Sequence, residues 1–284
     1  TTPTSRISPF TASTPQKEIN SAPHDFLNNF SSLQLVSFPL NLWQAWFTWQ
    51  FRLPQPQIVQ ALADGRSRCP GCGNTLEAYG FHTTTCKRGH RGAFQAAHQY
   101  VVDALAREAT LANIDNRTER RHQYHPGGRS STDIIFRGQW GDGAARLSFL
   151  ALDVTMRSAV RGSAGDRNQW GSMPDWSTQV ERPAEQHKIN KHQAIEQGPH
   201  GIRGRFLPVV LSTYGRLSPE SVRLLGMLSH LQVRDFLSAR GPGWDPDQHA
   251  QWIAAVCGRF FQRVKSRFTA SVAVATALRL LPPP

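Results

Sequence analysis

Acidic residues are scarce in this chain of 284 residues: 20 Asp and Glu stand against 32 Lys and Arg, giving a formal net charge of +12. Charged residues of both signs amount to 18%, below the usual share of about a quarter, so missing acids contribute to the imbalance as much as added bases. Such a surplus favours a polyanionic partner, either nucleic acid or an anionic membrane surface. The apolar share of 39% is that of a globular protein and excludes wholesale disorder.

Long apolar runs are also missing. A membrane-spanning helix needs about 20 consecutive apolar residues, and the best candidate, residues 269–281, is shorter and carries Arg279. The chain does not open with the basic stretch and apolar run of a secretory signal peptide. The sequence therefore predicts no membrane span. Because the first residue is Thr rather than Met, we expect the chain to be part of a longer protein.

Cysteine is rare as well, but three of the four cysteines are clustered. Cys69, Cys72 and Cys86 share one short segment with His82, in the spacing Cys-x2-Cys-x9-His-x3-Cys. A Cys-x2-Cys pair directs two thiolates at one ion from a tight turn, and His82 and Cys86 are one helical turn apart. These ligands predict a structural, tetrahedral Zn²⁺ site rather than a disulfide framework, with His90 as a weaker substitute ligand.

Basic residues surround this segment. They are Arg66, Arg68, Lys87, Arg88 and Arg91, against the single acid Glu77. A metal-bound loop would hold such side chains rigidly enough to contact phosphates. The alternative is an ordinary solvated basic surface.

The order of the predicted elements indicates an α/β fold with an antiparallel hairpin closed by the Gly-rich turn 138–143. Periodicity predicts helices over 40–62 (broken by the prolines at 54 and 56), 94–111, 183–197, 218–238 and 247–268, and strands over 132–136, 146–155 and 206–213. We divide the chain into a flexible lead-in (1–39), a helical linker (40–65), a zinc knuckle (66–92), an α/β core (93–240) and a C-terminal helix extension (241–284).

Two aspartates stand on the predicted hairpin. Asp133 opens its first strand and Asp153 lies near the end of the second, so the hairpin could bring their carboxylates together. Adjacent carboxylates repel one another unless a divalent cation lies between them. Oxygen ligands of this kind, completed by the carbonyl of Val154, suit Mg²⁺ or Mn²⁺. The alternative is that both aspartates cap turns at strand ends.

The helix predicted over 183–197 adds a lysine. Glu185, Lys188 and His192 share one face of it, and Lys191 points away from that face. Lys188 could orient an attacking water and stabilise charge developing on a phosphate. The alternative is a Glu–Lys surface pair.

The last predicted helix carries an apolar row, which favours core packing, beside a basic row. The basic row consists of Arg259, Arg263 and Arg267. It lies either along a phosphate backbone or in solvent. Cys257, alone on this helix, is expected to be a buried small apolar residue.

Taken in order, these pieces resemble the restriction-like endonuclease domain, of the PD-(D/E)xK type, found at the carboxyl end of non-long-terminal-repeat retrotransposon polyproteins. The matching pieces are CPGCGNTLEAYGFHTTTC at 69–86, STD at 131–133, LDVT at 152–155, AEQHKINKH at 184–192 and FLPVVLSTYGRLSP at 206–219. The likeness extends from Trp46 to Leu231 and is specific in the order and spacing of the pieces. Thr132 stands where the family has Pro, and His192 stands where it often has Tyr.

The resemblance implies a restriction-endonuclease-like mixed sheet flanked by helices and preceded by a small zinc knuckle with structural Zn²⁺. It implies that Asp133, Asp153 and the Val154 carbonyl hold a catalytic Mg²⁺ or Mn²⁺, and that Lys188 has replaced the lysine that the simplest motif places at Thr155. Nucleic-acid contacts are expected from Arg66, Arg68, Lys87, Arg88, Arg91 and Lys191.

The function implied is metal-dependent nicking of double-stranded target DNA in the nucleus. The domain would be part of a larger polyprotein with a reverse transcriptase, and the element's own RNA is a further candidate partner. Two other functions fit the same residues: a non-catalytic zinc-knuckle module that binds nucleic acid, and a zinc-stabilised scaffold that binds an acidic protein.

Overall fold

The structure, a computed structural model, describes residues 39–51, 53–86, 88, 90–118, 132–140, 147–157, 181–192, 204–239 and 249–280. Apart from its last residue, the lead-in predicted over 1–39 lies outside these ranges. The elements within them are α3 (Leu40–Gln50), α4 (Pro56–Ala63), α5 (Phe81–Thr85), α6 (Arg91–Leu111), β1 (Asp115–Thr118), β2 (Ile134–Trp140), β3 (Leu147–Arg157), α7 (Glu181–His192), β4 (Gly204–Ser212), α8 (Pro219–Ser238) and α9 (Ala250–Leu280).

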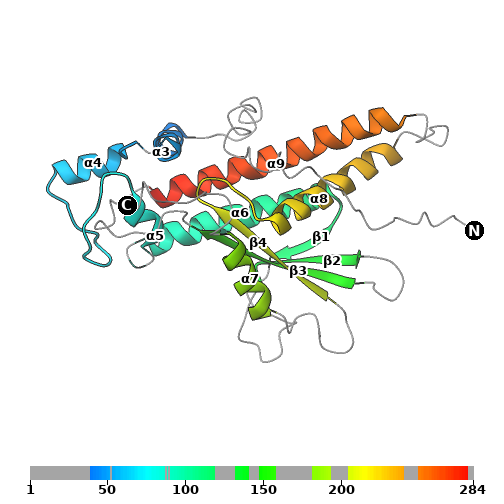
Figure 1. The fold of residues 1–284 in the computed structure, drawn as a ribbon, viewed down its shortest axis with the longest axis horizontal. Helices are drawn as coiled ribbons and strands as arrows, with labels where there is room; N and C mark the ends of the chain where they lie inside the picture. Colours follow the sequence, from blue (N-terminus) through cyan, green and yellow to red (C-terminus); the bar gives the residue numbers. More distant parts are fainter. Residues whose placement is uncertain are drawn as a thin grey trace, which may run out of the picture.

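A four-stranded mixed sheet lies at the centre, with helices on both of its faces (Figure 1). α6 and α8 cover one face, and α7 packs on the other against β3 and β4. Figure 1 shows α9 running along α6 and α8 on their side away from the sheet. The predicted α/β class is confirmed at this level.

The strand order is β1-β2-β3-β4. β1, β2 and β3 are antiparallel neighbours, and β4 pairs with β3 in parallel. Ile134 lies opposite Leu152, so the predicted antiparallel hairpin is confirmed. β2 continues to Trp140 through the beginning of the predicted turn, and its register with β3 shifts near Gly138, which has a φ of 147°.

Both faces of β3 are buried, which explains the nearly continuous apolar run of this strand. Leu152 and Val154 belong to the main core together with apolar side chains of α6, α8 and α9. On the α7 face, Phe149 forms a smaller cluster that includes Ala151 and Phe206. The strand is therefore fixed from both sides at the point where Asp153 lies.

The helix predicted over 40–62 is two helices, α3 and α4, separated at the prolines as expected. The helix predicted over 183–197 is α7, which ends at His192 within the described ranges. The last helix is longer than predicted, because α9 continues past residue 268 to Leu280. Among the helices described here, none is long and apolar enough to cross a membrane.

The C-terminal half of α9 supports the N-terminal helices. Trp49 of α3 and Phe81 of α5 pack against it in a buried cluster that also contains Leu280. The rings of Trp49 and Phe81 meet edge to face, with their centroids 5.6 Å apart. The segment around the cysteines is thereby attached to the same helix that covers the main core.

Arg267 does not belong to an exposed basic row. Its Nε and Nη2 each donate to a carboxylate oxygen of Glu108 on α6, at 2.7 Å, and Gln232 of α8 donates to Oε2 of Glu108 at 3.2 Å. Glu108 is buried. Arg259 and Arg263 are exposed, so two of the three predicted arginines lie on the surface and the third joins three helices.

Candidate metal centres

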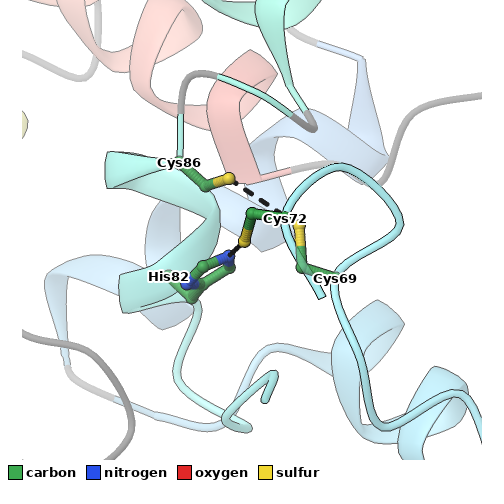
Figure 2. A group of neighbouring side chains, drawn as sticks. All are labelled: Cys69, Cys72, His82 and Cys86. Carbon is green, nitrogen blue, oxygen red and sulfur yellow. Dashed lines mark hydrogen bonds between the residues drawn. The ribbon is translucent and has the colours of Figure 1, made fainter. Parts of the chain in front are cut away.

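Four side chains converge as the cysteine spacing predicted (Figure 2). The ligand atoms of Cys69, Cys72, His82 and Cys86, here called the Cys3His cluster, all lie within 4.8 Å of one another. Cys72 Sγ lies 3.2 Å from His82 Nε2, and Cys69 Sγ lies 3.7 Å from Cys86 Sγ. All four cysteines of the chain are described and are free thiols. The cluster could therefore hold a metal ion such as Zn²⁺.

Local sequence explains this geometry. Gly73 adopts a left-handed φ of 74°, and its N–H donates to the carbonyl of Cys69 at 2.9 Å, which closes the turn that carries both thiols. α5 then brings His82 and Cys86 onto one helical turn, since the Cys86 N–H donates to the His82 carbonyl at 2.8 Å. Figure 2 shows the two pairs facing each other from the loop and from the short helix.

Glu77 supports the Cys3His cluster, a role that the sequence did not reveal. Its Oε1 accepts the N–H of His82 at 2.7 Å, and its Oε2 accepts the N–H of Tyr79 at 2.9 Å. Burial raises the pKa of Glu77, although these hydrogen bonds act against the increase. An acid just before a predicted helical turn was the available signal, because carboxylates stabilise free N–H groups at helix starts.

The electrostatic setting of Cys69 suits a metal-binding thiolate. Burial alone would raise the pKa of this thiol, but hydrogen bonds from the backbone of Gly71 and Cys72 and from the side chains of Cys86 and Cys72 together lower it. His90, the weaker substitute ligand, is buried with its Nε2 4.0 Å from Cys69 Sγ. The structure thus places the predicted substitute beside the four ligands.

The predicted phosphate-binding residues around the Cys3His cluster are mostly on the surface. Arg66, Arg68, Arg88 and Arg91 are exposed, and Lys87 lies outside the described residues. Arg66 pairs with Asp64 at 2.8 Å. Arg68 donates to the carbonyl of Gly73 at 3.3 Å. One of the basic side chains therefore also stabilises the turn that carries Cys69 and Cys72.

A second group of polar side chains gathers where β2 begins and β3 nears its end. We call Asp133, Asp153, Lys188, His98 and the Val154 carbonyl the carboxylate site. Asp133 Oδ2 accepts the N–H of Val154 at 2.6 Å. The Asp133 N–H also donates to the carbonyl of Leu152 at 2.8 Å, so the hairpin places Asp133 beside the backbone on either side of Asp153.

Lys188 and His192 reach Asp153 from α7. Lys188 Nζ donates to Asp153 Oδ2, and His192 Nε2 lies 3.5 Å from the same oxygen. Burial would raise the pKa of Asp153, but the hydrogen bond from His192 and the charge of Lys188 lower it to about 2. Lys191 is exposed, as predicted. Glu185 instead points to α8, where it accepts the N–H of Glu220 at 3.3 Å.

His98 of α6 is the residue that sequence reasoning missed. Its Nε2 lies 3.1 Å from Asp133 Oδ2 and 3.2 Å from the carbonyl oxygen of Val154. The hydrogen bond to Asp133 raises the pKa of His98 against the opposing effect of burial. No local sequence pattern could have predicted this contact, because His98 stands 35 residues from Asp133. The periodicity of α6 indicated only which of its residues face the core.

Comparison of the sequence with protein-family models finds no match, and comparison with curated proteins finds none either.

Proposed function

We propose that this chain is a metal-dependent DNA endonuclease domain with a restriction-endonuclease-like core and an adjoining zinc knuckle. The observation that supports it most is the carboxylate site, where Asp133, just before β2, bonds to the backbone of Val154, and Asp153 of β3 bonds to Lys188. Asp133 keeps a fifth of its side-chain surface exposed and Lys188 slightly less. The site is therefore built into the core but open to solvent.

The donor set fits a hard divalent cation. Carboxylate and carbonyl oxygens are the ligands that Mg²⁺ and Mn²⁺ prefer, and Asp133, Asp153 and the Val154 carbonyl provide them. Such an ion, when bound, supplies Lewis-acid stabilisation of the charge on a scissile phosphate. This charge compensation also offsets the repulsion between the two carboxylates.

Lys188 has two tasks in this proposal. Its ammonium holds Asp153 in the charged form, and it can donate to a water that attacks phosphorus. As the new P–O bond forms, the bond to one sugar oxygen breaks; the attacking water gives a proton to solvent, and the leaving sugar oxygen takes one from solvent. Fixed donors aimed at developing charge lower the barrier more than mobile ones. Lys188 is held in place because it belongs to α7, and α7 packs on β4.

The partner proposed is double-stranded DNA. The exposed arginine side chains near the Cys3His cluster and Lys191 would bind its phosphates. We also propose, as the resemblance implies, that the domain acts in the nucleus beside a reverse transcriptase that would use the nick as a primer site and bind the element's RNA.

The test is nicking of supercoiled plasmid by the full chain in Mg²⁺ or Mn²⁺. Asp153→Ala should reduce the nicking rate by about 10²–10³-fold, the range expected when a fixed electrostatic group is removed from the transition state, and leave DNA binding intact in a gel-shift assay. Asp103→Asn, at an exposed aspartate of α6, is the matched control and should nick normally. Binding without nicking by the wild type in both metals would overturn the proposal.

A second candidate is a non-catalytic nucleic-acid-binding module. It is favoured by the ion pair of Lys188 with Asp153, in which the lysine ammonium itself compensates the charge of the carboxylate. In this case DNA affinity should fall with salt at a log–log slope of about −0.9 per phosphate contact, with no cleavage. A slope near zero would instead favour the scaffold that binds an acidic protein.

A further inference from the structure

We propose that His98 Nε2 is itself a ligand of the divalent cation in the carboxylate site, and that this nitrogen makes the site prefer Mn²⁺ to Mg²⁺. The inference rests on the proposed function for the cation's role but names a ligand and a metal preference that the proposed function does not require.

The distances around His98 Nε2 fit an octahedral ion. Two neighbouring ligands of an octahedral ion with bonds of about 2.1 Å lie about 3 Å apart. His98 Nε2 lies 3.1 Å from Asp133 Oδ2 and 3.2 Å from the Val154 carbonyl oxygen. One ring nitrogen thus faces two of the three predicted oxygen ligands at the spacing that a shared ion requires.

The packing of α6 holds the imidazole of His98 in a fixed position. Ala97 and Val101, on either side of His98 along α6, are fully buried in the main core. Phe94, one turn earlier, is covered by the guanidinium of Arg279, 4.4 Å from the ring centroid. His98 itself keeps 35% of its side chain exposed, so an ion from solvent can reach a nitrogen that the helix holds in place.

The chemistry of the imidazole ligand distinguishes the two metals. Carboxylates, carbonyls and water suit Mg²⁺ and Mn²⁺ alike, whereas imidazole is a borderline ligand that suits transition metals. Affinity for a mixed nitrogen and oxygen site rises across the first transition series, starting from Mn²⁺. A site with His98 therefore discriminates against Mg²⁺, which a site of oxygen ligands alone would not do.

The alternative is that His98 only positions Asp133 through a hydrogen bond. In that case loss of His98 would weaken Mn²⁺ and Mg²⁺ binding equally, since both ions would meet the same displaced carboxylate. The two roles differ in selectivity, which can be measured without any cleavage reaction.

The experiment is Mn²⁺ binding to the full chain near pH 8, followed by the electron paramagnetic resonance signal of free Mn²⁺, with Mg²⁺ as competitor. His98→Ala should lower Mn²⁺ affinity by at least about tenfold, as a weakened ligand shell does, and change Mg²⁺ affinity much less. His98→Gln restores a side chain that can bond to Asp133 and should not restore the preference. His230→Ala, at an exposed histidine of α8, should bind both ions like the wild type.

Electron spin echo modulation by ¹⁴N gives a direct readout, expected in the wild type and absent in His98→Ala. Equal losses for both ions, rescue by His98→Gln, missing ¹⁴N modulation or no Mn²⁺ binding by the wild type would each overturn the inference. Nicking without ¹⁴N modulation would leave the proposed function standing alone. Modulation without nicking would leave a metal site that is not a nuclease.

Discussion

Asp153 shows how one buried carboxylate is kept charged. The lowering of its pKa to about 2 by His192 and Lys188 means that folding favours the ionised form. A group with a depressed pKa stabilises the fold above its unfolded pKa, about 4, and loses that contribution as pH falls through about 2.

In the metal-free protein, Asp153→Asn should therefore lower the free energy of unfolding by about 2 kcal/mol near pH 7, and by clearly less near pH 3. Urea unfolding of both proteins at each pH measures the difference. Asp103→Asn, which removes an exposed carboxylate, should change the free energy of unfolding only slightly at both pH values. An Asp153→Asn effect that stays constant with pH would contradict the assigned cause.

The Cys3His cluster leads to a second prediction at the residue scale. Cys86→Ala removes one of four ligands and should reduce bound zinc well below one per chain, as measured by mass spectrometry of the purified protein. Cys257→Ala is the matched control, because Cys257 is half-buried on α9 outside the cluster. Equal zinc content in the two variants would exclude this site.

The sequence allowed the four clustered ligands to be predicted because their contacts are local: a tight turn and one helical turn determine them. Asp133 and Asp153 could be predicted from a short hairpin. His98 could not, because it reaches Asp133 only through the packing of α6 on the sheet. For Glu77, which acts through backbone N–H groups, the one available signal was its position before the helical turn of His82 and Cys86.

At the scale of elements, the start of β4 packs closely against β3. Gly204 lies opposite Phe149, and a Cβ at Gly204 would meet that ring at 2.0–2.4 Å. Phe149 is buried and packed, so the ring has little room to move.

Gly204→Ala should lower the free energy of unfolding by about 1–3 kcal/mol or more, the usual cost of overpacking. Gly258→Ala, on the exposed side of α9 with nothing within 4 Å, should instead raise it by about 0.5–1 kcal/mol. Chemical unfolding of both variants tests the pair. Equal stabilities would contradict the close approach of β4 to Phe149.

Elements with strong periodicity were predicted to within a few residues, and the failures have physical causes. β1 is a short polar strand, DNRT, without alternation. The end of α9 gives no helical signal because residues 270–277 are all buried, so no polar face marks the period. Both depend on tertiary packing.

At the scale of the whole molecule, the ion pair of Glu108 and Arg267 joins α6 to α9, and Gln232 adds α8. Removing one partner of a buried pair leaves the other charge uncompensated. Arg267→Ala should therefore lower the free energy of unfolding by about 3 kcal/mol.

Arg263→Ala, one turn earlier and exposed, should change stability by less than about 0.5 kcal/mol. Thermal unfolding compares the two. If both substitutions changed stability by a similarly small amount, Arg267 would have to lie on the surface. The sequence alone had allowed it to face either a phosphate backbone or solvent there.

The pairing of residues 159 positions apart has a consequence for synthesis. α6 exposes apolar side chains that only α8, the sheet and α9 together cover, and α9 leaves the ribosome after all of them. We therefore expect the hydrophobic core of the nascent chain to remain partly uncovered through most of translation. It can be completed only after α9 has left the ribosome. Long-range contacts of this kind slow folding and leave partly folded chains dependent on chaperones.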